Sequence, residues 1–523
     1  MSRSKWVLIA AVLGSGIVFL DSTVVNVALP AIGRDLESSM FGVLEGQSYV
    51  YYGYLLTLSS LLILAGALSD YHGRRLMFTY GLAGFGATSV LCGLAPNMEL
   101  LILGRLLQGV AGAILVPGSL AIITSNFSGE EQGRAFGVWA GASAATAILG
   151  PPLGGFLVAT TSWRAVFLIN VPLIAVALWA TRRHVPETRG EDAHGRFDWL
   201  GALVIVIALG GLTFGVIRGQ ATNWQSQTAF VSLIAGAIAL GAFPIVQKRA
   251  ENPLMPLELF RSRNFTVTNI STFLIYGALY VGFQYQALFV IGTLGYNELA
   301  FGLAGIVGPL FLTLFSARMG VLAARVGPRW FMAVGPVVMG LGLLWFARVP
   351  GSSQAWVAEM SDGSSLIPPG DYWIDLFPAL FVFGVGLAIM VAPLTSALMR
   401  SVRPAHSGVA SAINNAISRI GPQLGGALLF VAATASFYGL LGELAPGIDT
   451  TSPVVRAELS PFNAPPEGSG PELERAVEDA STSAFHLTAI VSAGLCFLGG
   501  VVNAFGIRNE ELHGSDQADS LTH

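Results

Sequence analysis

Three charged side chains, Asp21, Arg105 and Arg419, stand inside long apolar stretches of the sequence. A carboxylate at mid-membrane costs about 2.5–3.5 kcal/mol even on the lenient insertion scale, so it is kept where it is protonated, faces a wet cavity or has a partner. Asp21 is the only one of the 31 acidic residues that lies away from the ends of these stretches. A carboxyl group that alternates between protonation and pairing with a guanidinium is a proton switch. The basic partners available to Asp21 are Arg105 and Arg419. A structural ion pair, or Asp21 as the cap of a helix broken near Pro30, is the alternative.

Aromatic and amide side chains recur on the same apolar stretches. Tyr276, Tyr280 and Gln284 follow one another at four-residue steps, which places them on one face of a helix. Aromatic rings in a wet cavity bind flat, cationic or amphipathic compounds without strict geometry, whereas ordinary helix packing is the alternative for each residue. The residues that we expect to contact a small-molecule substrate are Asn26, Tyr54, Gln108, Tyr276, Tyr280, Gln284, Asn415 and Arg419.

Glycines at four-residue spacing mark one stretch between residues 137 and 155, and two prolines interrupt it. Small residues at this spacing let two helix backbones approach closely, and proline bends a helix. The pattern predicts either a bendable contact that seals one side of the protein or plain packing. Its members are Gly137, Gly141, Gly150, Pro151, Gly154 and Gly155.

The segment GALSDYHGRR places a carboxylate beside two guanidinium groups at the end of an apolar stretch. A carboxylate in this position can reach the N-terminus of a neighbouring helix or an arginine and hold one conformation. We therefore expect a conformational latch made by Gly66, Asp70, Gly73, Arg74 and Arg75.

The composition places these residues in a membrane protein. Only 11% of the 523 residues are charged, 53% are hydrophobic and 63 are glycine, whereas soluble domains have about 25% charged residues. A span needs about 20 apolar residues. Fourteen stretches satisfy this, so we expect an all-α membrane protein with 14 transmembrane helices. They lie near 6–31, 48–69, 76–95, 98–122, 134–158, 164–181, 197–217, 227–247, 267–291, 300–320, 330–347, 374–398, 407–433 and 484–506.

The basic residues predict the orientation. With the N-terminus inside, nineteen of the 27 Lys and Arg residues fall in cytoplasmic segments, six fall outside and two lie within spans. Cytoplasmic loops carry the excess of Lys and Arg. We therefore expect a multi-pass protein of the cell membrane, inner or plasma, with both termini cytoplasmic.

Two pairs of segments repeat along the chain. GPPLGG at 150–155 matches GPQLGG at 421–426, and GALSDYHGRR at 66–75 matches GVLAARVGPR at 320–329. Parallel six-helix repeats with a substrate site between them characterise a large class of transporters. We expect an N-terminal bundle at 1–185, an inserted hairpin with its flanking loops at 186–262 and a C-terminal bundle at 263–508. The second bundle would have an outer loop at 436–483, in which residues 471–479 form either a short amphipathic helix leading into the last span or part of a solvated cap over the pore mouth. Residues 509–523 would form a cytoplasmic tail.

Several motifs resemble the major facilitator superfamily, and within it the fourteen-helix drug:proton antiporters. LDSTVVNVALP at 20–30 is similar to the signature of that branch, and LGRLLQGVAG at 103–112 to its motif in the fourth span. GPPLGG matches the antiporter motif, WRAVFLINVP at 163–172 is typical, and GALSDYHGRR resembles the loop between spans 2 and 3. The resemblance implies two bundles of major facilitator type, alternating access, proton influx coupled to drug or multidrug efflux, and a coupling role for Arg105. With Asp21 as the sole exchanger we expect one proton per cycle.

Rival functions remain open. The motifs concern coupling and gating, so a dedicated exporter of one endogenous lipid, peptide or metabolite fits them equally. An intramembrane enzyme would need a catalytic pair within the bilayer, and only one acid lies in a span. No metal site, cofactor or nucleotide motif is expected, and a net charge of −4 implies no nucleic-acid partner. The expected partners are a small-molecule substrate, protons and the lipid bilayer, with the protein functional as a monomer.

Overall fold

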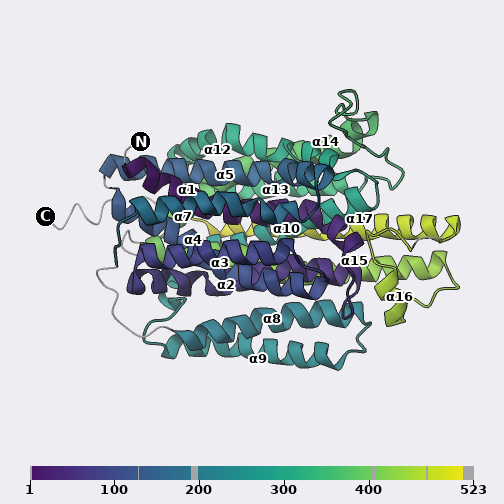
Figure 1. Ribbon diagram of the computed structural model, residues 1–523, viewed down its shortest axis with the longest axis horizontal. Coiled ribbons are helices and arrows are strands. Elements are labelled where there is room, and N and C mark those ends of the chain that lie inside the picture. The colour runs from purple at the N-terminus through teal and green to yellow at the C-terminus, as the bar shows by residue number, and fades with distance from the viewer. Residues whose placement is uncertain (1–2, 128, 190–197, 403–406, 467–468, 510–523) are drawn as a thin grey trace.

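The computed structural model of the protein describes residues 3–127, 129–189, 198–402, 407–466 and 469–509. In this part of the chain the structure is all-helical, and most helices lie lengthwise side by side with both termini at one end (Figure 1). The helices are α1 (Arg3–Asp35), α2 (Val43–His72), α3 (Arg74–Gly93), α4 (Met98–Asn126), α5 (Gly129–Thr160), α6 (Ala165–Leu168), α7 (Asn170–His184), α8 (Trp199–Ala221), α9 (Gln227–Arg249), η1 (Leu257–Arg261), α10 (Arg263–Gly292), α11 (Glu298–Ala304), α12 (Val307–Val326), α13 (Arg329–Phe346), η2 (Tyr372–Leu376), α14 (Phe377–Arg400), α15 (Ser407–Leu444), α16 (Pro453–Glu458) and α17 (Pro471–Gly506).

Every apolar stretch named above coincides with a helix or with two consecutive helices. Eleven helical segments among the described residues are long and apolar enough to cross a membrane. The other three expected spans fall on α2, on α5 and on the pair α11–α12. A helix satisfies its own backbone groups, which is why apolar chains of this length adopt it in lipid. The all-helical class is confirmed, and the count of fourteen spans stays a prediction.

Polar side chains fix where several helices begin. The Asn97 side chain accepts a hydrogen bond from the amide of Leu100 at the start of α4, and Asn297 does the same for Ala300 at the start of α11, both at 2.9 Å. Such caps satisfy amides that have no partner within the helix. The loops before α4 and α11 therefore end at defined residues.

The two GPxLGG segments pack in equivalent ways, each against the first helix of its own bundle. In α5, a Cβ on Gly150 would lie 2.8 Å from Thr23 Cβ of α1, and one on Gly154 would lie 2.9 Å from the Val24 oxygen. In α15, a Cβ on Gly425 would lie 3.5 Å from the Cα of Gly277 in α10. The close approach of the backbones depends on these glycines. The repeat in the sequence is thus a repeat of helix packing.

The helices α8 and α9 form a hairpin that lies along one side of the molecule (Figure 1). They pack mainly on each other, and α8 also contacts α2 and α15. Close contact within the hairpin comes from Gly211 and Gly236, where a Cβ on Gly211 would lie 2.9 Å from the Cα of Gly236. Large apolar side chains of α9 such as Ile234 and Ile238 are exposed, as expected for a lipid-facing helix.

The loop after α15 is shorter than the sequence predicts. The helix α15 continues to Leu444, and α17 begins at Pro471, so the connection covers 445–470 and contains the short α16. The segment 471–479 is not a separate helix but the first turns of α17. Its alternation of apolar and charged residues belongs to a helix that projects beyond the bundle before it enters the apolar stretch (Figure 1).

Candidate functional site

The Asp21 and Arg105 side chains form an ion pair inside the N-terminal bundle. Arg105 Nη1 of α4 lies 2.5 Å from Asp21 Oδ2 of α1, and both side chains are 0% exposed. The helix α1 continues through Pro30 without a break, so the alternative that Asp21 caps a broken helix is wrong. A buried ion pair is strongly destabilised when one partner is removed, typically by 3–5 kcal/mol. The pairing predicted from the sequence is therefore confirmed as geometry, and its role in coupling stays a prediction.

Three further polar side chains surround the Asp21 carboxylate. Gln108 Nε2 and Asn170 Nδ2 each donate to Asp21 Oδ1 at 3.1 Å. Both amides also donate to the Ser89 hydroxyl, while Gln108 Oε1 accepts from Arg105 at 2.7 Å. Hydrogen bonds to the ionised form favour it. The residues of this network come from α1, α3, α4 and α7. A change in the charge of Asp21 therefore alters hydrogen bonds that connect four helices.

Sequence reasoning missed Asn170 and Ser89. Asn170 lies in the segment WRAVFLINVP, which was noted as a motif without a role for its polar residue. The signal was present, since an amide and a hydroxyl in apolar stretches need hydrogen-bond partners. What the sequence does not provide is the three-dimensional proximity of α3 and α7 to Asp21.

Aromatic rings close the site around the Arg105 guanidinium. Its central carbon lies 4.1 Å from the centroid of the Tyr54 ring and 5.7 Å from that of Phe167. Its Nε donates to the Val50 carbonyl oxygen at 3.1 Å. A cation over a ring face is stabilised by the ring quadrupole. Arg105 is thus held by two rings and a backbone oxygen in addition to Asp21, so its position does not depend on the carboxylate alone.

The last glycine of each GPxLGG segment faces the other bundle. A Cβ on Gly155 of α5 would lie 2.9 Å from the Cα of Leu299 in α11. A Cβ on Gly426 of α15 would lie 2.6 Å from Cε1 of Tyr52 in α2. Pro151 lies on the same contact, because a Cβ on Gly302 of α11 would be 2.6 Å from the Pro151 oxygen. The two bundles therefore touch through these segments. Gly137 and Gly141 lie in α5, but their packing falls outside the described residues.

Polar pairs add to the contact between the bundles. Among the described residues, Arg34 Nη2 lies 2.6 Å from Glu298 Oε1, and a hydrogen bond of 3.3 Å joins the Gln47 amide to Asn463. A third pair, Gln423 to Ser59 at 2.8 Å, lies deeper in the helices. The first two pairs lie at the ends of α1 and α2 away from the chain termini. The structure is closed at that end.

The end of the segment GALSDYHGRR contacts a carboxylate from another part of the chain. Glu187, which follows α7, accepts hydrogen bonds from the amides of Arg75 and Leu76 at 3.0 and 3.1 Å. Gly73 has φ +119°, and a Cβ there would lie 2.6 Å from Glu187 Oε1. Glycine is required at position 73 because of the positive φ and because a side chain would clash with Glu187. Glu187 thus provides an acid at the N-terminus of α3, and the latch contact expected for Asp70 stays a prediction.

The equivalent loop in the C-terminal bundle has the same construction with a neutral side chain. Gly327 has φ +97°, and a Cβ there would collide with the Asn509 side chain, which follows α17. Asn509 Oδ1 accepts from the amide of Arg329 at 3.4 Å. The helix N-terminus favours the charged partner of the first bundle more than the neutral partner of the second. The two loops therefore differ in the charge of the side chain that binds the helix N-terminus.

The other latch residues lie at the end of α2 and the start of α3. Gly66 faces α4, where a Cβ would be 3.5 Å from Pro117 Cβ. Arg75 Nε lies 3.6 Å from Glu187 Oε2, and Arg74 donates its backbone amide to the Thr188 oxygen at 2.9 Å. Asp70 lies in the last turn of α2, but its side chain falls outside the described residues.

The residues predicted to contact substrate fall into two groups. Tyr54 and Gln108 are buried beside Arg105 in the N-terminal bundle, and the Tyr54 hydroxyl donates to the Val18 oxygen at 3.3 Å. Asn26 is also buried in α1. The second group lies on α10 and α15 of the C-terminal bundle, where the Tyr276 and Tyr280 rings are 6.1 Å apart. Its members are Tyr276, Tyr280, Gln284, Asn415 and Arg419. Substrate contact stays a prediction for both groups.

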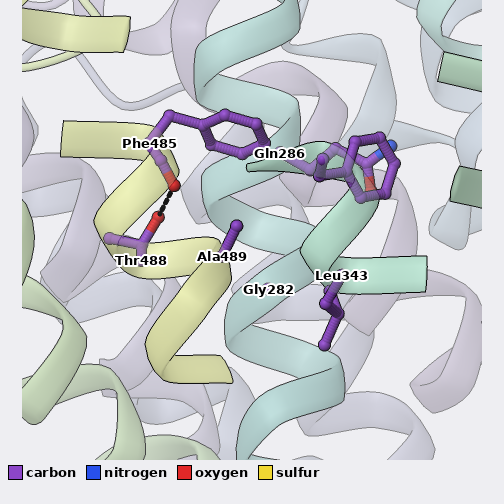
Figure 2. A pocket seen from close by; sticks show the side chains of 7 residues that line it. Gly282, Gln286, Leu343, Phe485, Thr488 and Ala489 are labelled. Atoms are coloured by element: carbon purple, nitrogen blue, oxygen red, sulfur yellow. Dashed lines mark hydrogen bonds between the residues drawn. The ribbon is translucent and has the colours of Figure 1, made fainter. Parts of the chain in front are cut away.

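A small cavity lies within the C-terminal bundle rather than between the bundles. Its volume of about 10 Å³ is close to what one water molecule needs. Figure 2 shows that Gly282 and Gln286 of α10 face Leu343 of α13 and the Phe485–Ala489 turn of α17 across it. This cavity is too small for an organic substrate.

Comparison with known proteins identifies the family. Residues 11–426 match the Major Facilitator Superfamily. The chain is 31% identical to the Multidrug resistance protein Stp of Mycobacterium tuberculosis (strain CDC 1551 / Oshkosh), over 82% of this chain and 76% of that protein. It is 30% identical to the Methylenomycin A resistance protein of Bacillus subtilis (strain 168), over 83% of this chain and 89% of that protein. It is 31% identical to the Tetracenomycin C resistance and export protein of Streptomyces glaucescens, over 81% of this chain and 75% of that protein.

Solved structures show the same fold. A bacterial homolog of the human lysosomal transporter Spinster aligns with a TM-score of 0.60 and 18% identity, covering 96% of this chain and 98% of that one. The nucleoside transporter NupG aligns with a TM-score of 0.59 and 12% identity, covering 97% of this chain and 100% of that one. The all-helical fold, the apolar helices and the sequence matches agree: the chain is a multi-pass membrane protein that belongs to the Major Facilitator Superfamily, with multidrug and antibiotic resistance transporters among its relatives.

Proposed function

We propose that the protein is a proton-driven antiporter that exports small amphipathic compounds. The observation that carries the proposal is the buried network around Asp21. Its carboxylate is fully enclosed and accepts hydrogen bonds from Arg105, Gln108 and Asn170. Protonation removes the negative charge that holds these donors, so it weakens contacts to α4 and α7 together. A proton taken up by Asp21 thereby changes how the helices of the N-terminal bundle are held.

The contacts between the bundles support a mechanism of alternating access. The contacts of Gly155 with α11 and of Arg34 with Glu298 close the end of the protein away from the termini. With both termini in the cytoplasm, this state is closed to the outside. Export requires that these contacts break while other contacts between the bundles form near the termini. At that end, Glu187 and Asn509 bind the loops that precede α3 and α13. The bundles then rock about a substrate site that lies between them.

The range of substrates is the finer part of the proposal. The names of the relatives include a multidrug resistance protein and proteins of resistance to single antibiotics, among them methylenomycin A and tetracenomycin C. We propose efflux of drug-like compounds as the function. The alternative is a dedicated exporter of one endogenous compound that works by the same mechanism, and it is favoured by a relative named as the probable actinorhodin transporter of Streptomyces coelicolor.

The test is drug susceptibility in pump-deficient bacteria that express the wild type or Asp21→Asn at matched levels in the membrane. We expect the wild type to raise the inhibitory concentration of several antibiotics of different structure, and a protonophore to restore the accumulation of those compounds. Asp21→Asn keeps the shape of the side chain but removes its titratable proton, so it should give no protection. Asp449→Asn, in the exposed outer loop, is the matched control and should protect as the wild type does.

Two results would contradict parts of the proposal. Protection by Asp21→Asn equal to that of the wild type would show that another group carries the proton. Protection against a single compound out of a broad panel would favour the dedicated exporter over multidrug efflux. In both cases membrane levels of each variant are measured, so that loss of protection is not confused with loss of protein.

A further inference from the structure

Arg419 of α15 is a buried cation with N–H groups that have no acceptor among the described residues. It is only 3% exposed, and its Nε and Nη1 atoms have no hydrogen-bond partner there. Arg105, the other buried arginine of the spans, has Asp21, Gln108 and the Val50 oxygen as acceptors for its Nε and Nη1, and its Nη2 alone is without a partner in this part of the chain. A guanidinium carries five N–H donors and stays charged in proteins. Arg419 therefore has buried N–H groups that a bound acceptor could satisfy.

The position of Arg419 is between the two bundles. Its guanidinium lies 5.6 Å from the centroid of the Phe19 ring in α1. Tyr51 and Tyr54 of α2 and Tyr276 of α10 lie within electrostatic reach of it. Arg419 itself belongs to the C-terminal bundle, whereas α1 and α2 belong to the N-terminal bundle. The cation thus points at the surface along which the bundles meet, not at lipid.

The charges of this region do not balance. Asp21 and Arg105 neutralise each other within the N-terminal bundle, and Asp21 is the only carboxylate away from the ends of the expected spans. Arg419 is left as one net positive charge. A lone charge in such surroundings is expensive and is retained for function. An anion that enters between the bundles would supply the missing acceptor.

A second buried side chain, on α10, carries unpaired polar atoms. Both amide atoms of Gln284 have no hydrogen-bond partner among the described residues. Buried polar groups are nearly always hydrogen-bonded, so such atoms call for a ligand or water. The Tyr276 and Tyr280 rings provide flat apolar surface nearby on α10. Donors, acceptors and rings together suit a planar compound with polar edges.

We propose that the exported compound carries an anionic group, such as a carboxylate or an ionised phenol, on a flat aromatic frame, and that Arg419 binds this group. The inference rests on the proposed function, because it names the substrate class of the same transport site. Arg419 forms charge-assisted hydrogen bonds to the anion, which are about twice as strong as neutral ones. The tyrosines and Gln284 contact the rest of the compound.

The test compares two dyes with the same three-ring frame and opposite charge. Fluorescein is anionic, and rhodamine 123 is cationic with its carboxyl group esterified. Binding of each to the purified full-length protein in lipid nanodiscs is measured by fluorescence polarisation at equilibrium, without any proton gradient. We expect fluorescein to bind more tightly than rhodamine 123. Arg419→Gln should weaken fluorescein binding by about 10- to 100-fold, the range for a hydrogen bond to a charged group.

Control variants separate charge from folding. Arg419→Lys keeps the charge and should retain most of the preference for fluorescein, whereas Arg348→Gln, at an exposed position outside the bundle interface, should bind both dyes as the wild type does. The proposal is overturned if rhodamine 123 binds as tightly as fluorescein, if fluorescein shows no saturable binding up to about 1 mM, or if Arg419→Gln weakens both dyes equally. Because the assay uses no gradient, failure of proton-driven efflux would leave its result standing.

Discussion

The replacement of Gly155 by alanine tests whether the contact of α5 with α11 closes the end of the protein away from the termini. A Cβ at this position would lie 2.7 Å from the carbonyl carbon of Glu298 and 2.9 Å from the Cα of Leu299. Both atoms belong to the backbone of α11, so no side-chain rotation relieves the clash. Overpacking of this kind costs about 1–3 kcal/mol. Since the contact joins the two bundles, the cost falls on the closed state and spares a state in which the bundles have separated.

A penalty of about 1–3 kcal/mol shifts a two-state equilibrium by about 5- to 150-fold. We would measure it with Ala300→Cys, at a fully buried position of α11, and a membrane-impermeant maleimide added from outside. The labelling rate should rise by that factor in Gly155→Ala. Gly439→Ala in α15 is the matched control, because nothing lies within 4 Å of the added Cβ, and its rate should stay unchanged. The reasoning is refuted if Gly155→Ala labels at the wild-type rate or if the control accelerates equally.

Three further predictions follow from the geometry. Glu187→Gln removes a charge from the N-terminus of α3, so we expect a loss of about 1 kcal/mol of stability, seen as a lower melting temperature. An unchanged melting temperature would contradict the latch. The pKa of Asp35 is lowered from 3.8 because the Trp163 indole and Arg164 donate hydrogen bonds to it. Its stabilisation is therefore complete above that value and lost as the pH falls through the lowered pKa, so acidification should lower the melting temperature less in Asp35→Asn than in wild type. Asn170→Ala removes a donor to a buried carboxylate and should reduce the free energy of unfolding by about 1–3 kcal/mol; equal denaturation curves would show that the bond is dispensable.

The sequence was sufficient for features that depend on composition or on single helices. A carboxylate and a guanidinium in apolar stretches must find each other, so the pair of Asp21 and Arg105 was predictable. Gly73 and Gly327 occur at equivalent places in the repeat and both have positive φ. Such features follow from the chemistry of the residue itself.

Features that depend on contacts between distant segments could not be predicted from the sequence. Glu187 binds the N-terminus of α3 because the chain after α7 returns to this end of the molecule, which the local sequence does not indicate. Asn170 completes the Asp21 site only because α7 packs on α1 and α3. The amide atoms of Gln108 bond Asp21, Ser89 and Arg105 in the structure, a set of partners that the sequence does not reveal, and its contact with substrate stays a prediction. Tertiary packing decides which polar groups meet.

The most direct test of the account is proton movement in proteoliposomes that contain the purified protein. A pH-sensitive dye inside the liposomes reports proton flux when a compound that the wild type exports is added. We expect the wild type to move protons against the compound and Asp21→Asn to exchange the compound down its own gradient with no proton flux. Proton flux in Asp21→Asn equal to that of the wild type would contradict the claim that this buried carboxyl group couples the transport.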